Sequence, residues 1–386
     1  MKMFKKVFAA LMVVAMLFSF AACGETNYAK DNTEFVIGVS GPLTGGAAVY
    51  GVAVKNGAQM AVDEINAAGG LNGVKFKLVA TDDTHDASKV AANYATMYEG
   101  GMQVSLGTVT TAPGLEFSKL SVEDNVFFLT PSASGDKIPE NANGFQMCFA
   151  DGNQGKVAAD YVNSLNLTKI GVFYKSDDPY SNGIYKQFKE NIASSVEVVE
   201  AVFTGEAQDF SAQISTLKDC TFIFMPIYYQ PASVFMTQAK DIIAADAVYY
   251  GCDGFDGLAG QFEDFSVIPQ EVSMLSHFDS NATSGAAADF IKKYTEKFGA
   301  DTLNQFGASA YDCVYAIYNA MKAAVDAGTE IDVTISPSDL CDILKGQFTG
   351  DFSYSGVTGS NITWEDNGYV AKEAVKYVLK TANSAQ

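Results

Sequence analysis

The chain has 386 residues, of which 48% are hydrophobic, and its formal net charge is −20 at pH 7. This length indicates two domains of ordinary size, each able to bury a core, and the negative charge excludes nucleic acid as a partner. All 25 basic residues are lysine, so any anion site must use hydroxyls, backbone N–H groups, helix N-termini or lysine in place of bidentate arginine.

The first 22 residues have the pattern of an export signal. Three lysines precede an apolar stretch, residues 7–18, that is too short to span a bilayer. Small residues then lead directly to Cys23, which resembles the bacterial lipobox, where the cysteine is lipidated and becomes the mature N-terminus. The alternative is an ordinary signal peptide with a chance cysteine. We expect a lipoprotein signal peptide over 1–22 and a tether over 23–33, which places the protein, lipid-anchored, on the extracytoplasmic face of the bacterial cell membrane.

Strands and helices alternate along the rest of the chain. The patterns predict strands at 35–40, 74–80, 103–107 and 126–130, and helices at 51–68, 87–98 and 114–123. The alternation restarts after residue 150, with strands at 169–174, 196–203, 221–225 and 247–251, and helices at 153–165, 181–193, 210–217 and 232–244. Such alternation predicts an α/β protein with two parallel sheets, each covered by helices on both faces.

The last third of the chain has no independent core. It contains helical patterns at 286–298, 308–327 and 338–346, and an alternating, strand-like pattern at 369–380. We expect these segments to be shared between two lobes, so that the chain crosses the hinge several times. The predicted boundaries are 34–148 plus 277–348 for lobe 1, and 149–276 plus 349–382 for lobe 2.

No catalytic signature is present. The chain lacks GxSxG, HExxH and Walker A patterns, and His85 and His277, its only histidines, have no partner at metal-ligand spacing, so we interpret both as ordinary polar residues. We therefore expect no enzyme activity, no cofactor and no bound metal. Beyond Cys23 the cysteines have no CxxC spacing, and we expect mostly small buried thiols at Cys148, Cys220, Cys252, Cys313 and Cys341.

Polar and aromatic residues follow the carboxyl ends of the predicted strands, which is the edge where open α/β sheets bind ligands. In the first lobe these residues are Thr108, Thr110, Thr111, Ser132 and Ser134, and in the second lobe they are Tyr180, Tyr228 and Asp253. Ordinary turn chemistry explains any one of them. Their recurrence on equivalent edges of two lobes favours a shared ligand site.

Segments 35–51 and 55–73 resemble the opening of the branched-chain amino-acid binding proteins, which are the type I periplasmic solute-binding proteins of ABC importers. Further landmarks match in the same order at 129–134, 180–183, 224–231 and 249–254. The resemblance covers nearly the whole mature chain. It implies two Rossmann-like, doubly wound lobes, joined by a three-crossover hinge, that close over a ligand.

The resemblance also implies which residues of lobe 1 hold the ligand's carboxylate. In the loop after residue 107, Thr110 or Thr111 would bind it, with the choice between them open. In the next loop, a backbone carbonyl would take the ammonium group and a hydroxyl the carboxylate, and these roles fall on Ser132 and Ser134.

The remaining roles fall mostly on lobe 2. Tyr180 and Tyr228 correspond to the tyrosines that close over the ligand. Asp253 stands where the family usually has the glutamate that pairs with the ammonium group, so the charge is kept on a side chain one methylene shorter. Tyr50 and Val109 would line the side-chain pocket.

We therefore expect a solute-binding lipoprotein that delivers a small, aliphatic amino acid to the permease subunits of an ABC importer. Two alternatives stay open: the same fold binding a non-amino carboxylate or amide, or a ligand sensor for a signalling partner. Asp253 argues against simple acids, because a buried carboxylate that faces another anion is unfavourable.

Overall fold

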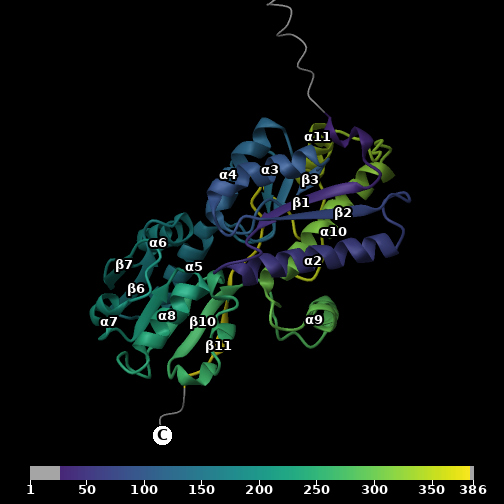
Figure 1. Cartoon of the computed structure of the whole chain (residues 1–386). Helices are drawn as coiled ribbons and strands as arrows, with labels where there is room; N and C mark the ends of the chain where they lie inside the picture. The colour runs from purple at the N-terminus through teal and green to yellow at the C-terminus, as the bar shows by residue number, and fades with distance from the viewer. Residues whose placement is uncertain (1–26, 383–386) are drawn as a thin grey trace, which may run out of the picture.

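The computed structural model describes residues 27–382, which form two α/β lobes, each built on its own sheet (Figure 1). The predicted signal peptide and Cys23 lie outside the described residues. Within the described range, no helix is both long enough and apolar enough to cross a lipid bilayer.

Lobe 1 contains a parallel sheet of five strands in the order β2-β1-β3-β4-β5. All seven residues of β1 are buried, because its alternate side chains pack into apolar clusters on opposite faces: Ile37 and Val39 on one, Val36 on the other. The strands are β1 (Phe35–Gly41), β2 (Phe76–Asp82), β3 (Val104–Ser105), β4 (Phe128–Thr130) and β5 (Gly144–Gln146). The helices between them are α2 (Ala48–Ala67), α3 (Val90–Glu99) and α4 (Thr111–Glu123).

Lobe 2 contains six strands in the order β11-β10-β9-β8-β6-β7, all parallel to their neighbours except β11, which is antiparallel to β10. The strands are β6 (Lys169–Lys175), β7 (Glu197–Phe203), β8 (Phe222–Met225), β9 (Val248–Gly251), β10 (Glu271–Ser276) and β11 (Val375–Lys380). The helices are α5 (Asp151–Ser164), α6 (Pro179–Asn191), α7 (Ser211–Leu217) and α8 (Tyr229–Ala239). Local chemistry defines the start of α6, where Asp178 caps the N–H of Ser181 and proline occupies the first turn.

The last third of the chain returns to lobe 1 and then to lobe 2 (Figure 1). Three helices pack on lobe 1: α9 (Gly285–Phe298), α10 (Gln305–Asp326) and α11 (Pro337–Phe348). Helix α10 crosses α2 at Gly57, where a Cβ atom would lie 1.9 Å from the Gly307 carbonyl oxygen. The chain passes between the lobes after β5, after β10 and after α11, which confirms the predicted class of two doubly wound lobes with a three-crossover hinge. The lobe boundaries stay predictions.

Several elements differ from the sequence expectation. Neither β5 nor β10 is predicted from the sequence. Strand β5 has only three residues, of which the first is glycine, and β10 contains two buried serines, so neither has the continuous apolar run that identifies a buried strand. Strand β11 is antiparallel and starts at Val375 instead of 369. Helices α4 and α8 start at Thr111 and Tyr229, instead of 114 and 232, which makes Thr110 and Tyr228 their N-cap residues.

The five cysteines of the described range are all free and buried, as the sequence predicts. Burial raises the thiol pKa of Cys148, Cys252 and Cys313 well above the ordinary value. These residues therefore behave as small core side chains.

Candidate functional site

The cleft between the lobes contains a small cavity of about 10 Å³, room for about one water molecule, which we name the inner cavity. All nine residues that the sequence predicts for the ligand site line it: Tyr50, Val109, Thr110, Thr111, Ser132, Ser134, Tyr180, Tyr228 and Asp253. Gly254 and Phe306 complete the lining and are not predicted from the sequence. The structure thus brings the predicted residues together, and their contact with a ligand stays a prediction.

Lobe 1 contributes hydroxyl groups from the loops after β3 and β4. Thr110 is the N-cap of α4 and Thr111 is its first residue, and the Thr110 side chain caps no N–H group of the helix. Ser132 and Ser134 lie in the loop after β4. The Thr130 hydroxyl holds this loop by accepting a hydrogen bond from the N–H of Ala133, which lies between the two serines, at 3.0 Å. Because a helix N-terminus carries partial positive charge, the start of α4 and these hydroxyls form a region suited to a carboxylate.

Lobe 2 contributes a carboxylate held by tyrosine. The Tyr180 hydroxyl, on α6, donates a hydrogen bond to Asp253 Oδ1 at 2.6 Å and accepts one from Gly254 N–H at 2.9 Å. The Tyr180 ring stacks on that of Tyr228, the N-cap of α8, with 4.4 Å between ring centroids. The Tyr228 hydroxyl is buried and has no hydrogen-bond partner among the described residues.

Two buried acids adjoin the inner cavity. Asp253 is 2% exposed, and so is Asp151, the first residue of α5, which accepts a hydrogen bond from the Thr111 hydroxyl at 3.2 Å. Burial raises the pKa of Asp253 to about 6, and burial together with the Asp253 charge raises the pKa of Asp151 well above its ordinary value. In the part of the chain that the structure describes, no ion pair joins either carboxylate to a lysine.

Direct contacts across the cleft hold the lobes in a closed arrangement. The Tyr50 hydroxyl of lobe 1 donates a hydrogen bond to the Gly254 carbonyl of lobe 2 at 2.5 Å. At the start of α10, the Gln305 N–H donates to the Asp256 carboxylate of lobe 2 at 2.9 Å. The inner cavity is therefore bounded by both lobes at once.

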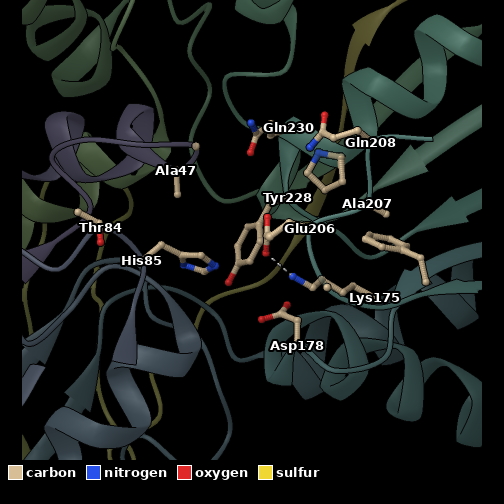
Figure 2. Close-up of a pocket in the computed structure, with 14 residues that line it drawn as sticks. Ala47, Thr84, His85, Lys175, Asp178, Glu206, Ala207, Gln208, Tyr228 and Gln230 are labelled. Carbon is tan, nitrogen blue, oxygen red and sulfur yellow. Dashed lines mark hydrogen bonds and ion pairs between the residues drawn. The ribbon is translucent and has the colours of Figure 1, made fainter. Parts of the chain in front are cut away.

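A larger pocket, the cleft pocket, opens beside the inner cavity and has a volume of about 250 Å³. Figure 2 shows that His85 reaches from lobe 1 toward Tyr228 of lobe 2 and that Lys175 faces Glu206. The Lys175 ammonium and the Glu206 carboxylate form an ion pair with 3.0 Å between nitrogen and oxygen. Tyr228 lines both spaces. From the sequence, His85 is interpreted as an ordinary polar residue. Its distance along the chain from the other candidate site residues does not indicate that it lies in the cleft.

Asp151 is a second residue that sequence reasoning misses. The one feature of the sequence that could have indicated it is its position, because it is an acidic residue at the point where the chain first passes from lobe 1 to lobe 2. The other histidine, His277, lies at the second crossover, where its Nε2 is 2.6 Å from the Ser309 hydroxyl. Among residues 27–382, no group of histidine, cysteine and acidic side chains is arranged to hold a metal ion.

Known proteins share this architecture. Residues 34–374 match the sequence profile of the family described as periplasmic binding protein. The Leu/Ile/Val-binding protein BraC3 of Rhizobium johnstonii is 28% identical over 362 residues, which cover 89% of this chain and 95% of that protein. The leucine-, isoleucine-, valine-, threonine- and alanine-binding protein of Pseudomonas aeruginosa is 26% identical over 326 residues, which cover 80% of this chain and 84% of that protein.

Solved structures agree with these relatives. LivJ from Streptococcus pneumoniae, a branched-chain amino acid transporter substrate-binding protein solved with isoleucine, has 28% identity and a TM-score of 0.74, covering 89% of this chain and 100% of that chain. The leucine-binding protein LivK from Thermotoga maritima shares the fold, with a TM-score of 0.77 at 22% identity, covering 90% and 96% of the two chains. Because the family profile matches most of its length, this chain belongs to the periplasmic binding protein family, in the group of the branched-chain amino-acid binding proteins.

Proposed function

We propose that this protein is the extracytoplasmic, lipid-anchored solute-binding component of an ABC importer, and that it closes over a small, aliphatic amino acid. The observation that carries the proposal is the pair of buried carboxylates, Asp151 and Asp253, which have no lysine partner in the described part of the chain. Two adjacent buried anions are unfavourable unless a cation joins them or one is protonated. The ammonium group of an amino acid supplies that cation.

The other walls of the inner cavity suit the rest of an amino acid. Its carboxylate would accept hydrogen bonds from the hydroxyls of Thr110, Ser132 and Ser134 near the start of α4, and from Thr111 only if that hydroxyl releases Asp151. An aliphatic side chain would lie against the rings of Tyr50 and Phe306 and against Val109. This division into a charged end and an apolar wall matches the solutes in the names of the relatives BraC3 and LivJ.

The mechanism follows from the placement of these groups on two lobes. Hydroxyls for the carboxylate belong to lobe 1, and Asp253 with its tyrosines belongs to lobe 2, so a complete site exists only when the lobes meet. A ligand that contacts both lobes shifts the equilibrium toward the closed form. The permease subunits would recognise that closed form and accept the solute from it.

A binding screen tests the proposal. The protein without its leader is stripped of co-purified ligand by unfolding and refolding, and its thermal unfolding is followed with leucine, isoleucine, valine, alanine and their deaminated analogues. A ligand at a hundred times its Kd adds about 2.7 kcal/mol of stability, which is a visible rise in Tm. Stabilisation by the amino acids but not by the deaminated acids supports the proposal, and the reverse pattern contradicts it in favour of a non-amino carboxylate.

The lipid anchor needs a separate test, because Cys23 lies outside the described residues. Expressed with its leader, the wild-type protein should partition into detergent and carry an added acyl mass on Cys23. The Cys23→Ala variant should stay in the aqueous phase. Equal partitioning of the two proteins would contradict the anchor and leave the binding proposal intact.

A further inference from the structure

His85 occupies a conformation that its residue type rarely adopts. It has φ 64°, and Thr84 before it has φ 51°, so two non-glycine residues in succession lie in the left-handed region. The side chains of the two preceding acids hold this turn: Asp82 accepts a hydrogen bond from the Thr84 N–H, and Asp83 accepts one from the His85 N–H, each at 2.9 Å. Backbone strain that neighbouring side chains stabilise in this way is typical of functional sites.

The turn directs the imidazole into the cleft, where it contacts a residue of each lobe. His85 Nδ1 is 2.9 Å from the Thr110 hydroxyl, and the ring meets the ring of Tyr228 edge-on, with 5.2 Å between centroids. Thr110 lines the inner cavity, His85 lines the cleft pocket, and Tyr228 lines both. The imidazole therefore stands at the boundary between the two spaces, and Figure 2 shows its cleft-pocket side, where it lies beside Tyr228.

We propose that His85 is a specificity-determining residue which, with Tyr228, closes the inner cavity against the cleft pocket and so limits the length of the ligand's side chain. This inference rests on the proposed function, because it concerns the selectivity of the same amino-acid site. It goes beyond that function by assigning the limit to a residue outside the inner cavity.

The physical reason lies in the two spaces that the wall separates. The inner cavity has a volume of about 10 Å³ and is lined by aromatic rings, hydroxyl groups and Asp253, whereas the cleft pocket has about 250 Å³ and is lined by polar side chains, including Lys175, Glu206 and Gln230. With the wall in place, a ligand side chain that extends toward the cleft pocket must displace His85 or Tyr228. Without His85, such a side chain could extend into the cleft pocket.

The imidazole is suited to this position because it is neutral there. Burial lowers the pKa of His85, and the nearby Lys175 charge lowers it further. A neutral imidazole offers one donor and one acceptor nitrogen, so it can hold the Thr110 hydroxyl without adding a charge beside the ligand. His85 therefore separates the two spaces and also positions the hydroxyl of Thr110, a residue predicted to bind the carboxylate of the amino acid.

The test uses two substitutions that the left-handed turn tolerates, His85→Gly and His85→Asn. Isothermal titration of the stripped protein without its leader gives the Kd for leucine, as the short ligand, and for phenylalanine and glutamine, as the long ones. The Gln208→Ala variant, which changes the far side of the cleft pocket, is the matched control. The ratio of the long-ligand Kd to the leucine Kd should fall about tenfold or more in both His85 variants and stay unchanged in the control.

Three results would overturn the inference. A Kd ratio that stays constant while all affinities fall equally would show that His85 only supports the fold of the site. Wild-type protein that binds phenylalanine or glutamine as tightly as leucine would show that no such limit exists. If neither the wild type nor the variants bind any amino acid, the proposed function is wrong and the inference is wrong with it. In the first two results an amino acid still binds, so they contradict the inference alone.

Discussion

Buried acids occur both at the hinge and in the cleft, and their surroundings differ. At the hinge, the fully buried Asp312 of α10 accepts hydrogen bonds from the Tyr354 hydroxyl at 2.9 Å and from the N–H groups of Val357 and Thr358 at 2.9 and 2.8 Å. The Thr358 hydroxyl donates another at 2.5 Å and accepts one from Lys372 at 2.6 Å. This carboxylate has a complete set of protein partners.

In the cleft, Asp253 and Asp151 are as deeply buried, but their partners are uncharged: the Tyr180 hydroxyl for Asp253, and the Thr111 hydroxyl and the Gln154 amide for Asp151. No lysine pairs with either acid in the described part of the chain. A complete set of partners indicates a carboxylate that stabilises the fold, and an incomplete set indicates one that receives a ligand. The comparison therefore separates two uses of the same residue type by what surrounds it.

The largest effect is expected at the hinge. Asp312→Ala removes the acceptor of four hydrogen bonds and leaves buried N–H groups without a partner, so the free energy of unfolding should fall by about 3–5 kcal/mol. Denaturant unfolding of the unliganded protein measures this loss. Asp312→Asn, which keeps one acceptor oxygen, should lose less, and a loss below about 1 kcal/mol in the alanine variant would contradict the structural role.

Asp253→Ala should reduce ligand affinity and not stability, which is the opposite of the effect expected for Asp312→Ala. Amino-acid binding should weaken by about 2–5 kcal/mol, because the ammonium group loses its anion, while the free energy of unfolding of the unliganded protein at pH 7 should not fall, because the variant lacks a buried carboxylate of raised pKa. Titration calorimetry and denaturant unfolding measure the two quantities. Glu206→Ala, which changes an acid of the cleft pocket whose side chain is 88% exposed, is the control and should change neither. Unchanged affinity in Asp253→Ala would remove Asp253 from the site.

Local sequence patterns explain why the fold could be largely predicted. Buried parallel strands are continuous apolar runs, so β1 and β6 are recognisable from a few residues. Strand β10 is missed because Ser273 and Ser276 interrupt its apolar pattern, although both serines are buried. A serine that is buried only through tertiary packing has no local signal.

The candidate site likewise contains residues that the sequence predicts and residues that it does not. Seven of its nine predicted residues follow strand ends, where topology alone places ligand contacts, whereas Tyr50, on α2, and Val109 were predicted from the resemblance to the binding-protein family. Asp151 and His85 could not be predicted in this way. Asp151 adjoins the inner cavity only because the first crossover brings α5 beside it, and His85 enters the cleft through a left-handed turn. Both depend on contacts between distant segments, which spacing along the chain does not encode.

The pH dependence of stability should sharpen the comparison. Burial raises the pKa of Asp253 to about 6, above its value of about 4 in an unfolded chain. The folded form therefore binds the proton more tightly, so the contribution of Asp253 to stability is fully present below about pH 4 and is lost as the pH rises through about 6. Relative to Asp253→Asn, the wild type should lose about 2–3 kcal/mol between pH 4 and pH 7.

Urea unfolding of the two unliganded proteins at matched pH values measures this difference. Buried acids away from Asp253 titrate in both proteins and largely cancel, whereas Asp151, whose pKa the Asp253 charge raises, adds to the difference in the same direction. An exposed acid provides the control: Asp160→Asn should follow the wild-type curve at every pH. Parallel curves for the wild type and Asp253→Asn would mean that the Asp253 carboxylate keeps an ordinary pKa, and the contrast with the hinge would then lose its electrostatic basis.

The smallest effect concerns the Tyr228 hydroxyl, which is buried without a partner although its ring is well packed against Tyr180. A buried hydroxyl that lacks a hydrogen bond does not stabilise the unliganded protein, so Tyr228→Phe should leave the free energy of unfolding unchanged or raise it slightly. If the hydroxyl is kept for the ligand, the same variant should bind the amino acid about 1 kcal/mol more weakly. Tyr354→Phe at the hinge should do the reverse, because that hydroxyl already has Asp312 as its partner. A matched pair of phenylalanine variants that both lose stability, or both lose affinity, would contradict the distinction between a completed hinge and an incomplete cleft.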